Sequence, residues 1–117
     1  MKHGVFEQPQ PAKRLTIYLG ESDRWKGEPL YEAIVLKARE VHLGGATVTR
    51  GPMGFGATSR IHFSKILRLS EDLPMVVTIV DTGAKIASFL PLLEKMMTGG
   101  LVTIEDVGVL LYSPSTP

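Results

Sequence analysis

Apolar residues recur along the chain with two periods, one typical of strands and the other of helices. Alternating β-branched, aromatic and aliphatic residues predict strands at residues 14–20, 46–50, 74–81 and 101–112, each bordered by a glycine or a proline. Apolar residues three and four apart predict a helix opened by Glu28-Pro29 and a second one across residues 86–97. The order of strand, helix, strand, strand, helix, strand predicts an α+β fold, a ferredoxin-like βαββαβ domain with a four-stranded antiparallel sheet.

Two interruptions are expected within these elements. Pro91 falls inside the second helical pattern, so it should kink that helix or move its start downstream. Asp106 and Gly108 fall inside the last strand, where they indicate a bend or a bulge.

The two ends of the chain differ from the middle. Residues 1–12 contain Gly4, Pro9 and Pro11 with little periodicity and are expected to form a flexible arm. Residues 113–117, Ser-Pro-Ser-Thr-Pro, are expected to form a flexible tail. A single domain is therefore predicted for residues 13–112.

The strand predicted at residues 74–81 is apolar on both faces. Val76 and Val80 point to one side of the sheet, and Val77 and Ile79 point to the other. Right-handed crossovers place both helices on the same side, so the second side lacks a cover. We expect subunits to bury it against each other, which predicts a homo-oligomer; a monomer with an apolar strand is the alternative.

Composition narrows the class of protein. The chain has 117 residues, 44% of them hydrophobic, a net charge of +1 and no cysteine. The small net charge argues against a nucleic-acid-binding protein, which usually has a large basic excess. The lack of cysteine excludes thiolate metal sites and cysteine nucleophiles. Because no apolar run approaches the roughly 20 residues of a membrane span, a cytoplasmic protein without membrane insertion is expected.

The first candidate ligand site lies in the connection predicted between the two middle strands. Connections beyond about 12–15 residues are uncommon in compact domains unless they carry a function. No acidic residue occurs between Glu40 and Glu71, whereas four basic residues do, which indicates a local site for an anion. A solvated basic loop is the alternative. The candidate residues are Arg50, Gly51, Gly54, Phe55, Gly56 and Arg60, with glycine N–H groups for a phosphate and an aromatic ring for a base.

The second candidate site is the predicted turn from the third strand into the second helix. A helix start offers unpaired N–H groups and a favourable dipole to an anion, and a lysine there adds a full charge. Asp81 or Thr82 can instead act as an ordinary helix cap. The candidate residues are Gly83, Ala84, Lys85 and Ile86.

Four ordered motifs between Leu15 and Tyr112 resemble those of the PII-like (nitrogen regulatory protein-like) superfamily, and specifically an uncharacterised branch of small PII-like proteins. They are Gly-Glu at 20–21, Gly-Ala-Thr-Val at 45–48, Gly-Phe-Gly at 54–56 and Leu-Ser-Glu-Asp-Leu-Pro at 69–74. The resemblance implies a signalling homotrimer rather than an enzyme, with an adenine nucleotide in each cleft between subunits. It also implies that the long loop after the second strand regulates a partner, either a membrane transporter or an enzyme.

The resemblance extends to the phosphate contacts, with two departures. Residues 83–86 look like a shortened form of the family's Gly-Asp-Gly-Lys-Ile phosphate loop, which gives Lys85 the role of the phosphate-binding lysine. The family's loop is longer, and its members carry basic residues after the last strand, where this chain has none in residues 113–117. We therefore expect AMP or ADP to be preferred over ATP.

Two other classes of function stay open. In a small ferredoxin-fold oligomeric enzyme, His62 is the natural general base and Asp72 the residue that orients it. In a metal-binding trimer, ligands come from His3, His42 and His62, which show no ligand spacing, so no metal is predicted.

Overall fold

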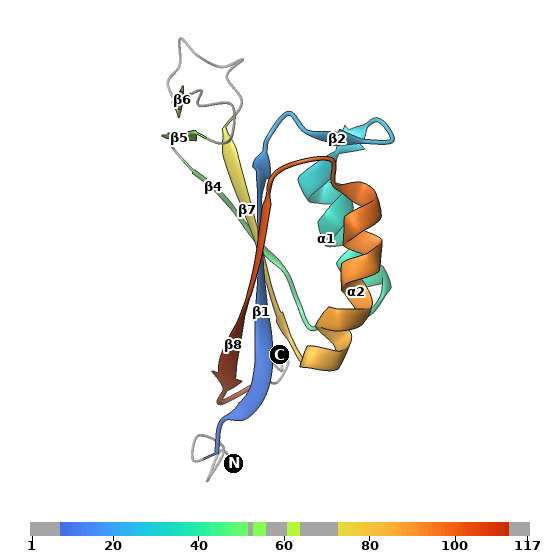
Figure 1. Ribbon diagram of the computed structural model, residues 1–117, viewed down its shortest axis with the longest axis vertical. Helices are drawn as coiled ribbons and strands as arrows, with labels where there is room; N and C mark the ends of the chain where they lie inside the picture. The colour runs from blue at the N-terminus through green and yellow to red at the C-terminus, as the bar shows by residue number, and fades with distance from the viewer. Residues whose placement is uncertain (1–7, 52, 56–60, 64–72, 113–117) are drawn as a thin grey trace, which may run out of the picture.

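The described part of the chain forms one sheet covered on one side by two helices (Figure 1). The computed structural model describes residues 8–51, 53–55, 61–63 and 73–112. The main elements are β1 (Gln10–Gly20), α1 (Leu30–Glu40), β4 (Thr47–Arg50), β7 (Pro74–Asp81), α2 (Gly83–Met96) and β8 (Leu101–Val109). Two short hairpins add β2 (Arg24–Trp25) with β3 (Glu28–Pro29), and β5 (Met53–Phe55) with β6 (Ile61–Phe63).

The strand order confirms the predicted ferredoxin-like fold. The four-stranded sheet has the order β4-β7-β1-β8, and every neighbouring pair is antiparallel. β1 lies in the centre, where Leu15 pairs with Ile79 on one side and with Ile104 on the other. Each βαβ half therefore returns its second strand two positions away, which leaves the central positions to β1 and β7.

The hydrophobic core lies between the sheet and the helices. Alternate residues of the central strands point into it, and four of the helical positions that meet them are completely or almost completely buried. The strand residues are Leu15, Ile17, Leu19, Met75, Val77 and Ile79, and the helical ones include Ile34, Ile86, Phe89 and Leu93.

The opposite side of the sheet carries a row of four threonines. Thr47 pairs with Thr78, Thr78 with Thr16, and Thr16 with Thr103, so that the row crosses all four strands. We call this side the open face, because no described helix lies on it (Figure 1). Beside the threonine row, Tyr18 and Leu101 form a cross-strand pair with exposed fractions of 43% and 55%, and Val76 extends it onto β7.

Two strands differ from the sequence-based expectation. β1 begins at Gln10, so residues 10–12, expected in a flexible arm, belong to the sheet, where they pair with β8. β8 runs to Val109 in one unbroken register and has no bulge at Asp106 or Gly108. Asp106 forms an ion pair with Lys13, and a Cβ at Gly108 would lie 2.9 Å from the Pro9 Cβ, so that glycine permits a close approach.

The expected downstream shift of the second helix was also wrong. α2 begins at Gly83, eight residues before Pro91, and continues through it to Met96. Proline removes a bond to the carbonyl four residues earlier, which is that of Ala87. Both residues are exposed, so water can satisfy this carbonyl on the solvent side of the helix.

Phe89→Ala is expected to lower the free energy of unfolding by about 3–5 kcal/mol, because it removes a fully buried ring from the centre of the core. Leu36→Ala on α1 is the matched control, since its side chain is 61% exposed and its loss should cost little. Urea unfolding at one fixed protein concentration measures both values. Equal losses in the two variants would contradict this core.

Candidate functional site

Arg50 and Glu21 form an ion pair between the ends of β4 and β1, where the β4–β7 connection leaves the sheet. The Arg50 Nη2 lies 2.5 Å from the Glu21 Oε2, and the two side chains are 52% and 31% exposed. The Glu21 N–H donates to the Leu73 carbonyl at 2.8 Å, and the Gly51 N–H donates to the Pro74 carbonyl at 2.8 Å. Both ends of the connection are thus held to the sheet, and Glu21 contacts both of them.

The connection itself contains the β5–β6 hairpin, whereas the sequence indicated a loop. Gly54 pairs with His62 and Phe55 pairs with Ile61 in antiparallel register. The candidate residues Gly56 and Arg60 lie outside the described residues.

The start of α2 is capped within the chain. The Thr82 Oγ1 accepts a hydrogen bond from the Lys85 N–H at 3.2 Å, so Thr82 has the capping role that the sequence allowed. The Lys85 Nζ donates to the His42 carbonyl at 3.2 Å, just beyond the end of α1. The Ile86 side chain is fully buried and its N–H donates to the Thr82 carbonyl, so Ile86 supports this turn from the core.

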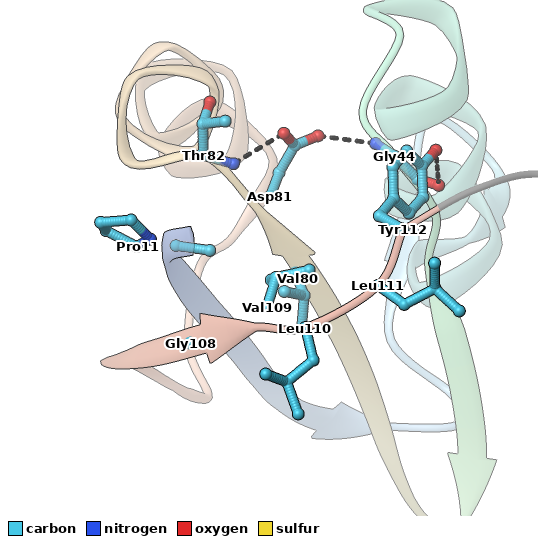
Figure 2. Close-up of a pocket in the computed structure, with 11 residues that line it drawn as sticks. Pro11, Gly44, Val80, Asp81, Thr82, Gly108, Val109, Leu110, Leu111 and Tyr112 are labelled. Atoms are coloured by element: carbon cyan, nitrogen blue, oxygen red, sulfur yellow. Dashed lines mark hydrogen bonds between the residues drawn. The ribbon is translucent and has the colours of Figure 1, made fainter. Parts of the chain in front are cut away.

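Asp81 and Tyr112 hold the backbone of Gly44 from two sides (Figure 2). The Gly44 N–H donates to the Asp81 Oδ2 at 2.6 Å, and its carbonyl accepts from the Tyr112 Oη at 2.9 Å. The chain after β8 therefore crosses to the far edge of the sheet. A cavity of about 600 Å³ lies beside it, with mostly apolar walls. Those walls include Ala12, Val80, Val109, Leu110 and Leu111.

The two groups of candidate residues lie at opposite ends of the sheet. Arg50 pairs with Met75 near the start of β7, and Asp81 ends the same strand six residues later. At about 3.3 Å per residue the two ends are about 20 Å apart, so Arg50 and Lys85 cannot hold one phosphate in one chain. The predicted candidate residues therefore form two separate groups in one chain, with Arg50 and Gly51 at one end of the sheet and residues 83–86 at the other.

A second glycine turn lies at the Arg50 end of the sheet, and sequence reasoning did not select it. Gly99 and Gly100 connect α2 to β8, next to the pairing of Leu101 with Tyr18. Gly100 has a φ of 105°, and no hydrogen bond from either glycine N–H is found within the described part of the chain. The turn lies three strand positions from Arg50, about 14 Å across the sheet. The strand order alone contains this signal, since β7 begins and β8 begins at the same end.

The described residues do not bring together the side chains of the alternative enzyme site or of the alternative metal site. His42 follows α1 with a φ of 65°, His62 is placed only by its position in β6, and His3 and Asp72 lie outside the described residues. Within residues 8–51, 53–55, 61–63 and 73–112, no three metal-ligating side chains gather as a cluster. None of the described helices is long and apolar enough to cross a membrane.

The fold is that of PII-like proteins. A putative PII-like signalling protein from Thermus thermophilus superposes with a TM-score of 0.62 at 19% identity, over 87% of this chain and 92% of that one. CPII from Thiomonas intermedia K12, solved with ADP and bicarbonate, gives a TM-score of 0.56 at 18% identity, over 86% and 89%. At these identities the likeness concerns the fold.

The chain belongs to the DUF190 family, described as "Uncharacterized ACR, COG1993", whose model matches residues 12–109. A UPF0166 protein of Aquifex aeolicus is 40% identical over 98 residues, which is 84% of this chain and 92% of that protein. A UPF0166 protein of Methanocaldococcus jannaschii is 38% identical over 99 residues, with 84% and 91% covered. The expected resemblance is thereby confirmed as membership of an uncharacterised family with a PII-like fold.

Gly100→Ala is expected to lower the free energy of unfolding by about 2 kcal/mol or more, because alanine is strained at a φ of 105°. The new Cβ would also lie 2.6 Å from the Tyr18 carbonyl oxygen. Gly99→Ala is the matched control, since nothing lies within 4 Å of its added Cβ. Thermal unfolding of both variants tests the turn, and similar melting temperatures would contradict it.

Proposed function

We propose that this protein is a PII-like regulatory protein that binds an adenine nucleotide between subunits and acts on a partner, without catalysing a reaction. The observation that carries the proposal is the arginine-anchored base of the β4–β7 connection. It occurs in a fold shared with CPII, a nitrogen regulatory PII-like protein solved with ADP, AMP and bicarbonate. Family membership supports the class of protein and leaves the ligand to experiment.

Assembly as a homotrimer would bury the open face. Tyr18 on β1 and Leu101 on the edge strand β8 form an exposed apolar pair, and Val76 adjoins them. The threonine row offers hydroxyl groups that can donate and accept at once, which suits a contact between identical surfaces. On the other side the helices cover β1 and β7, while Val102 and Ile104 of the edge strand β8 stay 40% and 50% exposed. We assign self-association to the open face, which no described helix covers.

Val76→Lys should dissociate the assembly, because a lysine would bury an unpaired charge between subunits. Leu36→Lys on α1 is the control, because it also introduces a lysine, but at an exposed leucine in the helical layer. Size-exclusion chromatography with light scattering gives the mass of each. A monomeric wild-type protein, or a Val76→Lys protein of unchanged mass, would contradict assembly through this face.

The phosphates of the nucleotide are placed at the Arg50 end of the sheet. Arg50 and the glycine turn at Gly99 and Gly100 lie at this end, and the basic part of the sequence begins here. The candidate residues Gly51, Gly54 and Phe55 follow Arg50 in the chain, in the connection that begins at this end of the sheet. At the other end, the Lys85 Nζ already donates to a carbonyl, and the Asp81 carboxylate stands close by and opposes an anion.

AMP or ADP is expected to be preferred over ATP, as the departures from the family's phosphate contacts implied. Within one chain, Leu110 to Tyr112 lie at the far end of the sheet from Arg50, so this segment could reach the phosphates only from a neighbouring subunit. It carries no basic residue, and residues 113–117 add none, so it would bring no cation to the outer phosphates.

Calorimetry with AMP, ADP and ATP tests the ligand and its position. Arg50→Ala should weaken binding by about tenfold or more, since a charge-assisted hydrogen bond contributes about 1.5–3 kcal/mol. Lys85→Ala should change the affinity by less than about threefold, because Lys85 lies at the far end of the sheet.

Three outcomes of this titration would contradict the proposal in different ways. Loss of binding in Lys85→Ala alone would move the site to the start of α2. ATP binding much more tightly than AMP would contradict the phosphate preference. Absence of any nucleotide binding would contradict the sensor function.

The partner is expected to meet the segment after β4, as the resemblance implied. A membrane transporter or an enzyme fits this role equally, and a cytoplasmic location is proposed with it. Binding of a nucleotide at Arg50 would act directly on the base of that segment, because Gly51 follows Arg50 in the chain.

A further inference from the structure

Glu21 brings a negative charge to the place where the proposed function puts the phosphates. Its carboxylate lies 2.5 Å from the Arg50 guanidinium and is 31% exposed, the more shielded partner of the pair. A phosphate that approaches Arg50 must therefore compete with a carboxylate that is already bound to it.

The position of Glu21 is fixed by its backbone as well as by its charge. Its N–H donates to the Leu73 carbonyl at 2.8 Å, directly after the last residue of β1. When a ligand binds Arg50, this backbone bond keeps the Glu21 main chain in place, so that the carboxylate stays within reach of the ligand. It would then repel each phosphate of the ligand, and the repulsion grows with the ligand's charge.

We propose that Glu21 is a specificity-determining residue, which limits the number of phosphates that the site at Arg50 accepts. This inference rests on the proposed function, because it requires a nucleotide at Arg50. A single carboxylate then does two things: it lowers the affinity for every nucleotide by occupying the guanidinium, and it lowers the affinity most for the nucleotide with the most phosphates.

Glu21→Gln separates this role from a structural one. Glutamine keeps the shape of the side chain and the N–H bond to Leu73, and removes the charge. If Glu21 merely supported the fold around Arg50, the substitution would leave all nucleotide affinities equal or lower. If it limits phosphate number, the affinities rise in proportion to ligand charge.

The chain offers a matched control in a second ion pair. The Glu40 Oε1 lies 2.7 Å from the Lys37 Nζ, and these side chains are 66% and 31% exposed. Glu40→Gln removes the same charge from a pair on α1, in the helical layer and away from the open face. Both variants change the net charge equally, so a difference between them is local.

The experiment is calorimetric titration of the full chain with AMP, ADP and ATP in wild type, Glu21→Gln and Glu40→Gln. Glu21→Gln should tighten AMP binding about threefold, ADP about fivefold and ATP about tenfold or more, with the gains shrinking as salt screens the charges. Glu40→Gln should leave the ratio of the three affinities as in wild type.

The outcomes distinguish the inference from the function beneath it. Equal or reduced affinities in Glu21→Gln, with wild-type binding intact, would overturn the role of Glu21 and leave the nucleotide site standing. The same ordered gain in Glu40→Gln would also overturn it, since net charge alone would then account for the effect. A wild-type protein that binds no nucleotide would overturn both.

Discussion

The sheet is covered on one side only, and this constraint shapes the rest of the molecule. Alternate side chains of β1 and β7 pack against the two helices and form the hydrophobic core, in which Leu15, Val77 and Phe89 are completely buried. The remaining side chains of the same strands face outward, where Tyr18 and Leu101 stand beside a row of threonines. In the proposed function a second subunit covers the open face, so that self-association continues the packing of the fold and the nucleotide site lies between subunits.

The strand order also decides where chemistry can gather. β7 runs from Met75, which pairs with Arg50, to Asp81. Two separate groups of polar residues therefore lie at its two ends. One end has an arginine, a glutamate and the glycine turn at Gly99 and Gly100, and the other has a capped helix start with a lysine directed at a carbonyl. Glu21 connects the two ends of the β4–β7 connection through its backbone and its carboxylate. A ligand that engages Arg50 would thus alter the base of the connection that is proposed to meet a partner.

The order of elements was predictable from the sequence because the hydrophobic periodicity and the glycines and prolines between elements agree over most of the chain. The strands at 74–81 and at 14–20 and both helices follow from alternation, from helical spacing and from flanking glycines. The start of α2 was not predictable, since the tolerance of Pro91 depends on Ala87 facing solvent, which is a tertiary fact. The unbroken register of β8 likewise depends on Lys13 and Pro9, which lie about a hundred residues away in sequence.

The candidate site was predictable only in its residue types. Arg50 and Lys85 each carry a suitable charge, but only the antiparallel path of β7 separates them by the length of a strand. The pairing of Arg50 with Glu21 spans 29 residues and has no local signal. The glycines at 99 and 100 follow the predicted helix with no local sign of a ligand, and their place beside Tyr18 emerges only when β8 joins the sheet.

Native mass spectrometry of the purified chain, titrated with ADP, tests the central claim most directly, because it reports assembly and ligand stoichiometry in one spectrum. The account predicts a trimer that takes up as many as three ADP molecules, with no ADP retained on dissociated monomers. A monomer that binds ADP alone, or a trimer that takes up none, would contradict a nucleotide site built between subunits.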